Sequence, residues 1–197
     1  MKLLTQIPEA AMVAVFLKAE ISSPRFGENV RKTMLLFNAK EAIITNPDIT
    51  NKHENELRAL VLGQCRGYRQ NRDMFKEIPN GLTWYKAELS LSEIGDLRYV
   101  DYSYWNELTD GSHLVKAGVN NIRKDRIVYD VPNDRFLALA DEIRNGQYDF
   151  EPIILWGQNI DSPLEILEGH LRATAFLLAG DRAPATIMIL VGLLEAP

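Results

Sequence analysis

A short run near the C-terminal end, Glu168-Gly169-His170-Leu171-Arg172, combines the residue types that bind phosphate. The run lies between an apolar segment and a pattern typical of a helix. At such a junction, the free backbone N–H groups of the first helical turn point toward an anion. Gly169 permits close approach of the backbone, His170 can donate a hydrogen bond, and Arg172 presents a planar fork that matches phosphate oxygens. The run therefore predicts an anion-binding turn between a strand and a helix.

Glu168 is the acid nearest this turn. A carboxylate in that position is suited to hold a metal ion or to orient a ribose or an attacking hydroxyl group. The combination predicts metal-assisted phosphoryl chemistry, with Glu168 as the metal ligand and Glu168, His170 and Arg172 as catalytic candidates. A structural alternative stays open, because Gly-His-Xaa-Arg is a short pattern: Gly169 is then only a turn, and Arg172 pairs with Asp181 or Glu168.

The segments around this turn have the patterns of alternating helices and strands. A helix is expected over 134–145, ended by Gly146, and a helix from Gly169 to Ala179, stopped by Gly180. Strands are expected at Ile153–Trp156, at Leu164–Leu167 and at Ala185–Val191, the last apolar enough to lie centrally in a sheet.

The first eighty residues have a helical pattern. One helix starts near Pro8, and a second is expected to be capped by Ser23 with Pro24 in its first position. A third should run from Glu54 to Gln70 and bury one face, formed by Leu57, Leu60, Val61 and Cys65. Because a turn and a strand at Thr83–Leu89 follow, we place a boundary at residue 80, between a helical region (1–80) and an α/β domain (81–197).

Two features after that strand also bear on the site. Ser90 and Glu93 have the spacing of a capping box, which predicts a short helix. The stretch Tyr99–Trp105 is the most aromatic of the chain; it serves either as a base-stacking surface or as core packing. Arg98 and His113 are further candidates for lining a cleft.

The order of motifs in the C-terminal third is distinctive: Arg135, Gly146, Pro152-Ile153-Ile154, Gly169-His170-Leu171-Arg172-Ala173-Thr174-Ala175, Gly180 and the final strand. From Arg135 to Val191, this order resembles the ParB/sulfiredoxin superfamily. The strand at 83–89 looks like the opening strand of that family, and residues 1–80 lie outside the resemblance.

The resemblance implies an α/β (α+β) fold, a mixed sheet with flanking helices to which this chain adds its N-terminal helical extension. It also implies a site in which Gly169, His170, Arg172 and Thr174 contact ATP or another nucleotide, with Mg²⁺ as the expected metal. Sulfiredoxins have their catalytic cysteine where this chain has His170, and the second arginine of the family motif is Leu171 here. Sulfinic acid reduction is therefore not expected. Centromere binding is not expected either, because a helix-turn-helix region does not fit after Arg182.

Among the remaining branches, the plasmid-borne Osa-like proteins match the layout best. That resemblance implies an ATPase or DNase that acts against transfer of competing DNA, with DNA and a DNA-transfer protein as partners. Two alternatives stay open. One is a nucleotide-dependent small-molecule kinase whose base is Glu88, Glu93, Glu107 or Asp110. The other is a non-enzymatic, nucleotide-sensing inhibitor or regulator that docks on a protein partner.

Composition limits the classes of function. A net charge of −5 over 197 residues argues against coating nucleic acid by bulk electrostatics, although Arg66, Arg69, Arg72 and Lys76 form a local basic run. The single cysteine, Cys65, excludes an intrachain disulfide, and no export signal or apolar stretch of about 20 residues is present. We expect a cytoplasmic protein without membrane insertion. The oligomeric state is left open.

Overall fold

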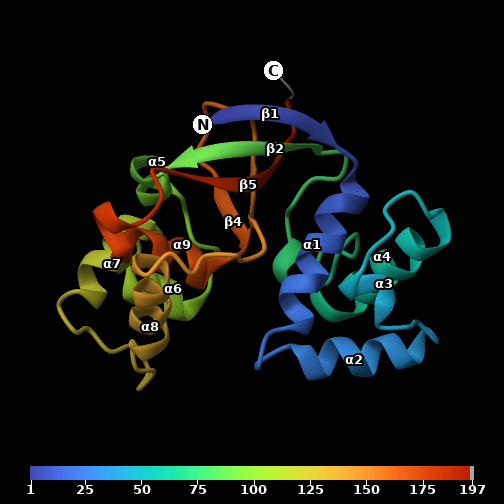
Figure 1. Cartoon of the computed structure of the whole chain (residues 1–197), viewed down its shortest axis with the longest axis horizontal. Helices are drawn as coiled ribbons and strands as arrows, with labels where there is room; N and C mark the ends of the chain where they lie inside the picture. The colour runs from blue at the N-terminus through green and yellow to red at the C-terminus, as the bar shows by residue number, and fades with distance from the viewer. Residues whose placement is uncertain (196–197) are drawn as a thin grey trace. The chain divides into compact units, whose positions relative to one another are not determined.

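The computed structural model describes residues 1–195, and the chain divides into two compact units (Figure 1). One unit, here called the C-terminal unit, comprises Met1–Gln6 and the chain from Tyr85 onward. The other, the N-terminal unit, comprises Ile7–Trp84. The chain passes from the N-terminal unit back into the C-terminal unit after Trp84, four residues beyond the boundary expected at residue 80. Assignment of the first six residues to the C-terminal unit differs from the expected division, because these residues add a strand to its sheet.

The C-terminal unit is built on a five-stranded sheet of order β1-β2-β5-β3-β4. The central strand β5 pairs in parallel with β3, in a register that joins Ile153 to Ile189 and Gly157 to Leu193, and β3 pairs antiparallel with β4. The mixed α/β class is confirmed, and the apolar last strand is central as expected. The strands are β1 (Lys2–Ile7), β2 (Thr83–Ser90), β3 (Ile153–Gly157), β4 (Glu165–Glu168) and β5 (Thr186–Leu193).

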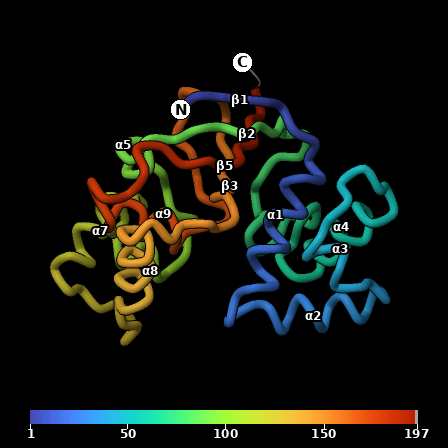
Figure 2. Tube along the Cα trace, in the orientation of Figure 1, coloured from blue at the N-terminus to red at the C-terminus, as the bar shows by residue number. Residues whose placement is uncertain are grey.

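Strand β1 is the element that the sequence pattern missed. It lies at the edge of the sheet beside β2, as Figure 2 shows. Leu3 is half-buried and packs against the core, whereas Leu4 is 41% exposed. An edge strand with so few inward side chains has little apolar alternation. Its partner β2 is also some eighty residues away, so no local signal marks the pairing.

Five helices follow in the C-terminal unit: α5 (Leu91–Asp96), α6 (Ser103–Leu108), α7 (Val115–Ile122), α8 (Asp134–Arg144) and α9 (His170–Ala179). The capping box before α5 is confirmed: the Ser90 hydroxyl accepts a hydrogen bond from the Glu93 N–H (3.4 Å), and Glu93 accepts one from the Ser90 N–H (2.8 Å). Helices α8 and α9 pack along each other, and their inward faces join β3 and β5 in one apolar core.

The N-terminal unit is helical, as expected: α1 (Glu9–Ile21), α2 (Gly27–Leu36), α3 (Ala42–Thr45), α4 (Lys52–Arg66) and a short 3-10 turn η1 (Asp73–Phe75). The expected start of the second helix was wrong. Ser23 and Pro24 lie in a preceding turn, in which the Ser23 carbonyl accepts from the Gly27 N–H (2.8 Å). Helix α4 ends four residues early, because Gly67 adopts a left-handed conformation (φ 79°).

The buried face of α4 also differs from the prediction. Leu60 is 51% exposed, whereas Arg58 is fully buried. The Arg58 guanidinium donates to the carbonyl oxygens of Ile43 (2.7 Å) and Asp48 (2.9 Å). A buried cation that contacts backbone carbonyls and pairs with Glu54 (3.5 Å) therefore lies on the inner face, where the apolar periodicity predicted Leu60. Within residues 1–195, no helix is long and apolar enough to cross a membrane.

Candidate functional site

The turn between β4 and α9 has the strand-turn-helix form that the sequence predicted. Strand β4 ends at Glu168, Gly169 adopts φ 99°, and α9 begins at His170. The first helical hydrogen bond runs from the Ala173 N–H to the Gly169 carbonyl (2.8 Å). A β-carbon on Gly169 would lie 3.0 Å from the Ile153 side chain and 3.1 Å from the Arg172 guanidinium. The backbone angle therefore favours glycine here, and a β-carbon would also make tight contacts with its neighbours.

Arg172 lies beneath this turn rather than extending into solvent. Its guanidinium forms an ion pair with the Glu168 carboxylate and donates a hydrogen bond to the Glu151 carbonyl oxygen. The side chain is only 12% exposed, and this burial lowers the pKa of Arg172 to about 10, while the Glu151 carboxylate acts in the opposite direction. Arg172 is still protonated at neutral pH. The structural alternative expected Arg172 to pair with Asp181 or with Glu168, and the ion pair is with Glu168.

Glu168 therefore has an electrostatic partner before any ligand arrives. Its side chain is 20% exposed, and Glu168 lies two residues before the first residue of α9, near the N–H groups of the first turn, which favour negative charge. A phosphate that binds the same N–H groups and Arg172 must compete with this carboxylate. Arg172 and Glu168 thus form a charge pair within the predicted anion-binding turn.

The His170 ring packs against the aromatic stretch instead of standing free in solvent. Tyr99 and Trp105 are stacked (centroids 4.3 Å apart, interplanar angle 10°), and Trp105 and His170 are nearly parallel (5.4 Å, 13°). The Tyr99 and His170 centroids are 6.1 Å apart, far less than the sum of the other two distances. Trp105 is therefore not sandwiched between the two rings, and the three nearly parallel rings form one compact cluster.

This packing decides between the two interpretations of the aromatic stretch for Tyr99. Tyr99 is fully buried, so its face is closed to a nucleobase. Its hydroxyl bonds to Thr174 Oγ1 (2.7 Å), and Thr174 in turn donates to the His170 carbonyl (2.8 Å). Because the Thr174 proton points to His170, Tyr99 is the donor of the first bond. Thr174 is itself fully buried, and its hydroxyl joins α9 to Tyr99.

The four acids considered as the general base of a small-molecule kinase all lie in ion pairs. Glu88 pairs with Lys2 (3.4 Å) and Glu93 with the Met1 ammonium group, while Glu107 and Asp110 both pair with Arg126. Residues 1–195 contain no group of three or more His, Cys, Asp or Glu side chains placed to hold a metal ion. A divalent ion at Glu168 would therefore need the substrate to supply much of its coordination.

The basic run of the N-terminal unit is neutralised by neighbouring acids. Arg66 makes a two-pronged contact with Glu20 (2.7 and 2.8 Å), Arg69 pairs with Glu9 (2.6 Å), and Arg72 pairs with Asp73. The Arg66 guanidinium also lies 3.5 Å from the centre of the Phe26 ring. Little positive charge remains to attract a nucleic-acid backbone.

One cluster of titratable residues was missed. Glu165 pairs with Trp156 across β3 and β4, and the Trp156 indole donates to its carboxylate (3.3 Å). Burial raises the pKa of the Glu165 carboxyl, while His113 and Arg98 act in the opposite direction. The backbone N–H of Arg98 donates to the Leu164 carbonyl (2.9 Å), and the N–H of Tyr99 donates to the His113 carbonyl (2.8 Å). A shared cleft lined by Arg98 and His113 stays a prediction, since the hollow that Arg98 lines does not include His113. No local sequence pattern marks this cluster, because its members meet only through the pairing of β4 with β3 and with the chain at Arg98.

No family model matches this chain, and neither a curated protein nor a solved structure matches it. The family resemblance stays a prediction that rests on the order of motifs.

Proposed function

We propose that this protein binds a nucleotide through its phosphates at the turn between β4 and α9. The observation that carries the proposal is the position of Arg172, a buried guanidinium at the first turn of a helix whose preceding residue is a glycine with φ 99°. Backbone N–H groups, a bare glycine and a guanidinium are the groups that proteins use to hold phosphate oxygens.

Binding at this turn requires an exchange of partners. The phosphate takes the guanidinium of Arg172 and the first-turn N–H groups, and the Glu168 carboxylate leaves its ion pair. Once released, Glu168 supplies a carboxylate that can hold Mg²⁺ together with oxygens of the bound phosphates. His170, with its ring supported by Trp105, lies at the first position of the same helix and provides a further hydrogen-bonding group.

The reaction that suits these groups is hydrolysis of ATP or of a DNA phosphodiester, as in the Osa-like branch that the motifs resemble. Water attacks the phosphorus atom, the bond to the leaving oxygen breaks, and the negative charge that develops is balanced by Arg172 and the helix N-terminus. Mg²⁺, when bound, polarises the phosphate oxygens. On this proposal the protein acts against transfer of competing DNA.

A second candidate, a nucleotide-sensing regulator without catalysis, is favoured by one specific observation. The Glu168–Arg172 ion pair closes the site on itself, and a bound phosphate would replace Glu168 as the partner of Arg172. Such a pair can report nucleotide binding to a protein partner without any bond being broken. Turnover separates the two candidates: the hydrolase consumes ATP or nicks DNA, and the regulator only binds.

Nucleotide binding is tested by calorimetry with ATP, ADP and GTP, each with and without Mg²⁺, beside assays of ATP turnover and of nicking of single- and double-stranded DNA. The informative variant is the double change Glu168→Gln and Arg172→Gln, because it leaves no unpaired charge in the interior. Its matched control is Arg144→Gln. Arg144 also joins a carboxylate (Asp141, 2.6 Å) and a helix carbonyl (Leu178, 2.7 Å), but from the last turn of α8.

We expect wild type and Arg144→Gln to bind nucleotide, and the double variant to lose at least tenfold in affinity, which corresponds to about 1.4 kcal/mol. Wild-type protein that binds no nucleotide at millimolar concentration overturns the proposal. Equal affinity in all three proteins places any binding elsewhere and also overturns it.

A further inference from the structure

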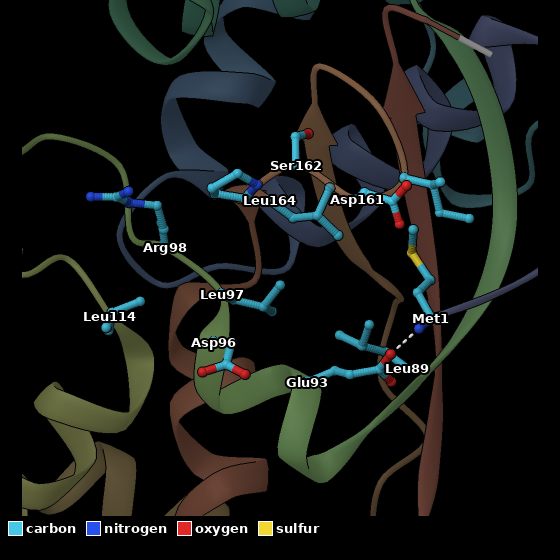
Figure 3. Close-up of a pocket in the computed structure, with 12 residues that line it drawn as sticks. Met1, Leu89, Glu93, Asp96, Leu97, Arg98, Leu114, Asp161, Ser162 and Leu164 are labelled. Carbon is cyan, nitrogen blue, oxygen red and sulfur yellow. Dashed lines mark hydrogen bonds and ion pairs between the residues drawn. The ribbon is translucent and has the colours of Figure 1, made fainter. Parts of the chain in front are cut away.

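A hollow of the C-terminal unit lies away from the β4–α9 turn. It has a volume of about 370 Å³, is open to solvent on one side, and is lined by α5, by Leu97 and Arg98, and by the loop 160–164 that joins β3 to β4 (Figure 3). Pockets that take small ligands span about 300 to 1,000 Å³, so this hollow has room for a compact molecule.

The floor of the hollow is apolar and fixed. Leu89, Leu97 and Leu164 are at most 8% exposed, and all three belong to the main core of the unit. Ile160 also lines it, from the loop before β4. Since these side chains are already held by the core, a ligand that covers the floor loses little affinity to reorganisation of the protein.

The rim is acidic. Glu93, Asp96 and Asp161 line the hollow, and the one cationic side chain of the lining, Arg98, points away from it in Figure 3. Two of the acids already have partners. Glu93 pairs with the Met1 ammonium group and accepts from the Ser90 N–H. Asp96 pairs with Lys116 (2.6 Å), and both of these side chains are exposed to solvent. Asp161 is exposed, and within residues 1–195 no cation pairs with its carboxylate, although the N–H of this residue donates to Asn159 Oδ1 (3.1 Å).

We propose that this hollow binds a small organic amine, with the ammonium group at Asp161 and a compact apolar body on Leu97 and Leu164. The uncompensated carboxylate selects positive charge, and the buried leucines select an apolar body of limited size. The same acids repel phosphate, so the ligand differs in class from the nucleotide proposed for the β4–α9 turn. The two proposals are independent of each other.

The test uses three probes that share a phenyl body and differ in charge: phenethylammonium, 2-phenylethanol and 3-phenylpropanoate. Binding is followed by amide chemical shifts in two-dimensional NMR, with Asp161→Asn as the site variant. Asp181→Asn is the matched control, because Asp181 is an exposed acid of the same unit, in the 3-10 turn after α9. We expect the cation to bind at least threefold more tightly than the alcohol, and to shift amides at 96–98 and 160–164.

Asp161→Asn should weaken binding of the cation about three- to fivefold, the range for a solvent-accessible charge pair, and leave binding of the alcohol unchanged. Asp181→Asn should bind all three probes as wild type does. Equal affinity for the cation and the alcohol, no binding of any probe, or equal losses in the two variants each overturns the proposal.

Discussion

The guanidinium of Arg172 is paired with the carboxylate of Glu168 across Gly169, so the two charged groups nearest the start of α9 neutralise each other. The pair is largely removed from water, with 12% and 20% of the two side chains exposed. In such surroundings, removal of one partner leaves the other as an uncompensated charge. The pair therefore contributes to the stability of the turn and, on the function proposed above, controls its affinity for phosphate.

Replacing Glu168 by glutamine should increase affinity for nucleotide measured without metal. The substitution removes the carboxylate that competes with phosphate for Arg172 while keeping the shape of the side chain. We expect a rise of about three- to tenfold by calorimetry, together with a fall of about 1–3 kcal/mol in the free energy of unfolding, since Arg172 loses its counter-ion. Unchanged or lower affinity contradicts competition between Glu168 and phosphate. In the presence of Mg²⁺, any turnover should fall, because the proposed metal ligand is gone.

Gly169→Ala should be more destabilising than Gly146→Ala. Both glycines have positive φ angles, 99° and 79°, so each substitution carries a conformational cost of about 1 kcal/mol. A β-carbon at Gly146 meets nothing within 4 Å, whereas at Gly169 it meets Ile153 and Arg172 at close to 3 Å. The total at Gly169 should reach about 2–3 kcal/mol in urea unfolding. Equal losses at the two positions mean that the contacts around Gly169 yield without cost.

Much of the turn could be predicted because its signals are local. The change from β4 through Gly169 to α9 depends on residues within about ten positions of one another. The same holds for two features elsewhere in the unit, the capping box of Ser90 and Glu93 and the end of α8 before Gly146. Local hydrogen bonds and backbone preferences determine such features, and these depend on neighbouring residue types.

The rest depends on contacts between distant residues. The pairing of β1 with β2, the stacking of Trp105 on His170 and the bond from Tyr99 to Thr174 join segments dozens of residues apart. A periodic pattern reports which face of an element is buried, but it does not report the partner. The Glu165 cluster was missed for the same reason, since its members meet only when β4 pairs with β3 and with the chain at Arg98.

Glu165 should make stability depend on pH in a predictable direction. Its pKa is raised above the ordinary value of 4.5, mainly by burial, so the folded protein holds the carboxyl proton more tightly than the unfolded chain. The stabilising contribution of this group is complete below pH 4.5 and is lost as the pH rises through the raised value. Glu165→Gln should therefore be more stable relative to wild type at pH 7 than at pH 4, because the amide still accepts from Trp156 and carries no charge. Urea unfolding of both proteins at several pH values measures this difference, and a difference that does not vary with pH contradicts the assignment.

The hydrogen bond between Tyr99 and Thr174 should couple the stability of the segment before α6 to that of the β4–α9 turn and its helix. Both residues are fully buried, and their hydroxyl groups are 2.7 Å apart. Tyr99→Phe removes the donor, and Thr174→Val removes the acceptor together with the bond from Thr174 to the His170 carbonyl. In a double-mutant cycle of unfolding free energies, we expect a coupling of about 1 kcal/mol, the usual net value of a buried neutral hydrogen bond. Strictly additive losses of unfolding free energy contradict this coupling. They would mean that α9 and the aromatic stretch are stabilised independently. With coupling present, Tyr99→Phe should also weaken nucleotide binding slightly, because the carbonyl and ring of His170 are held through Thr174 and Trp105.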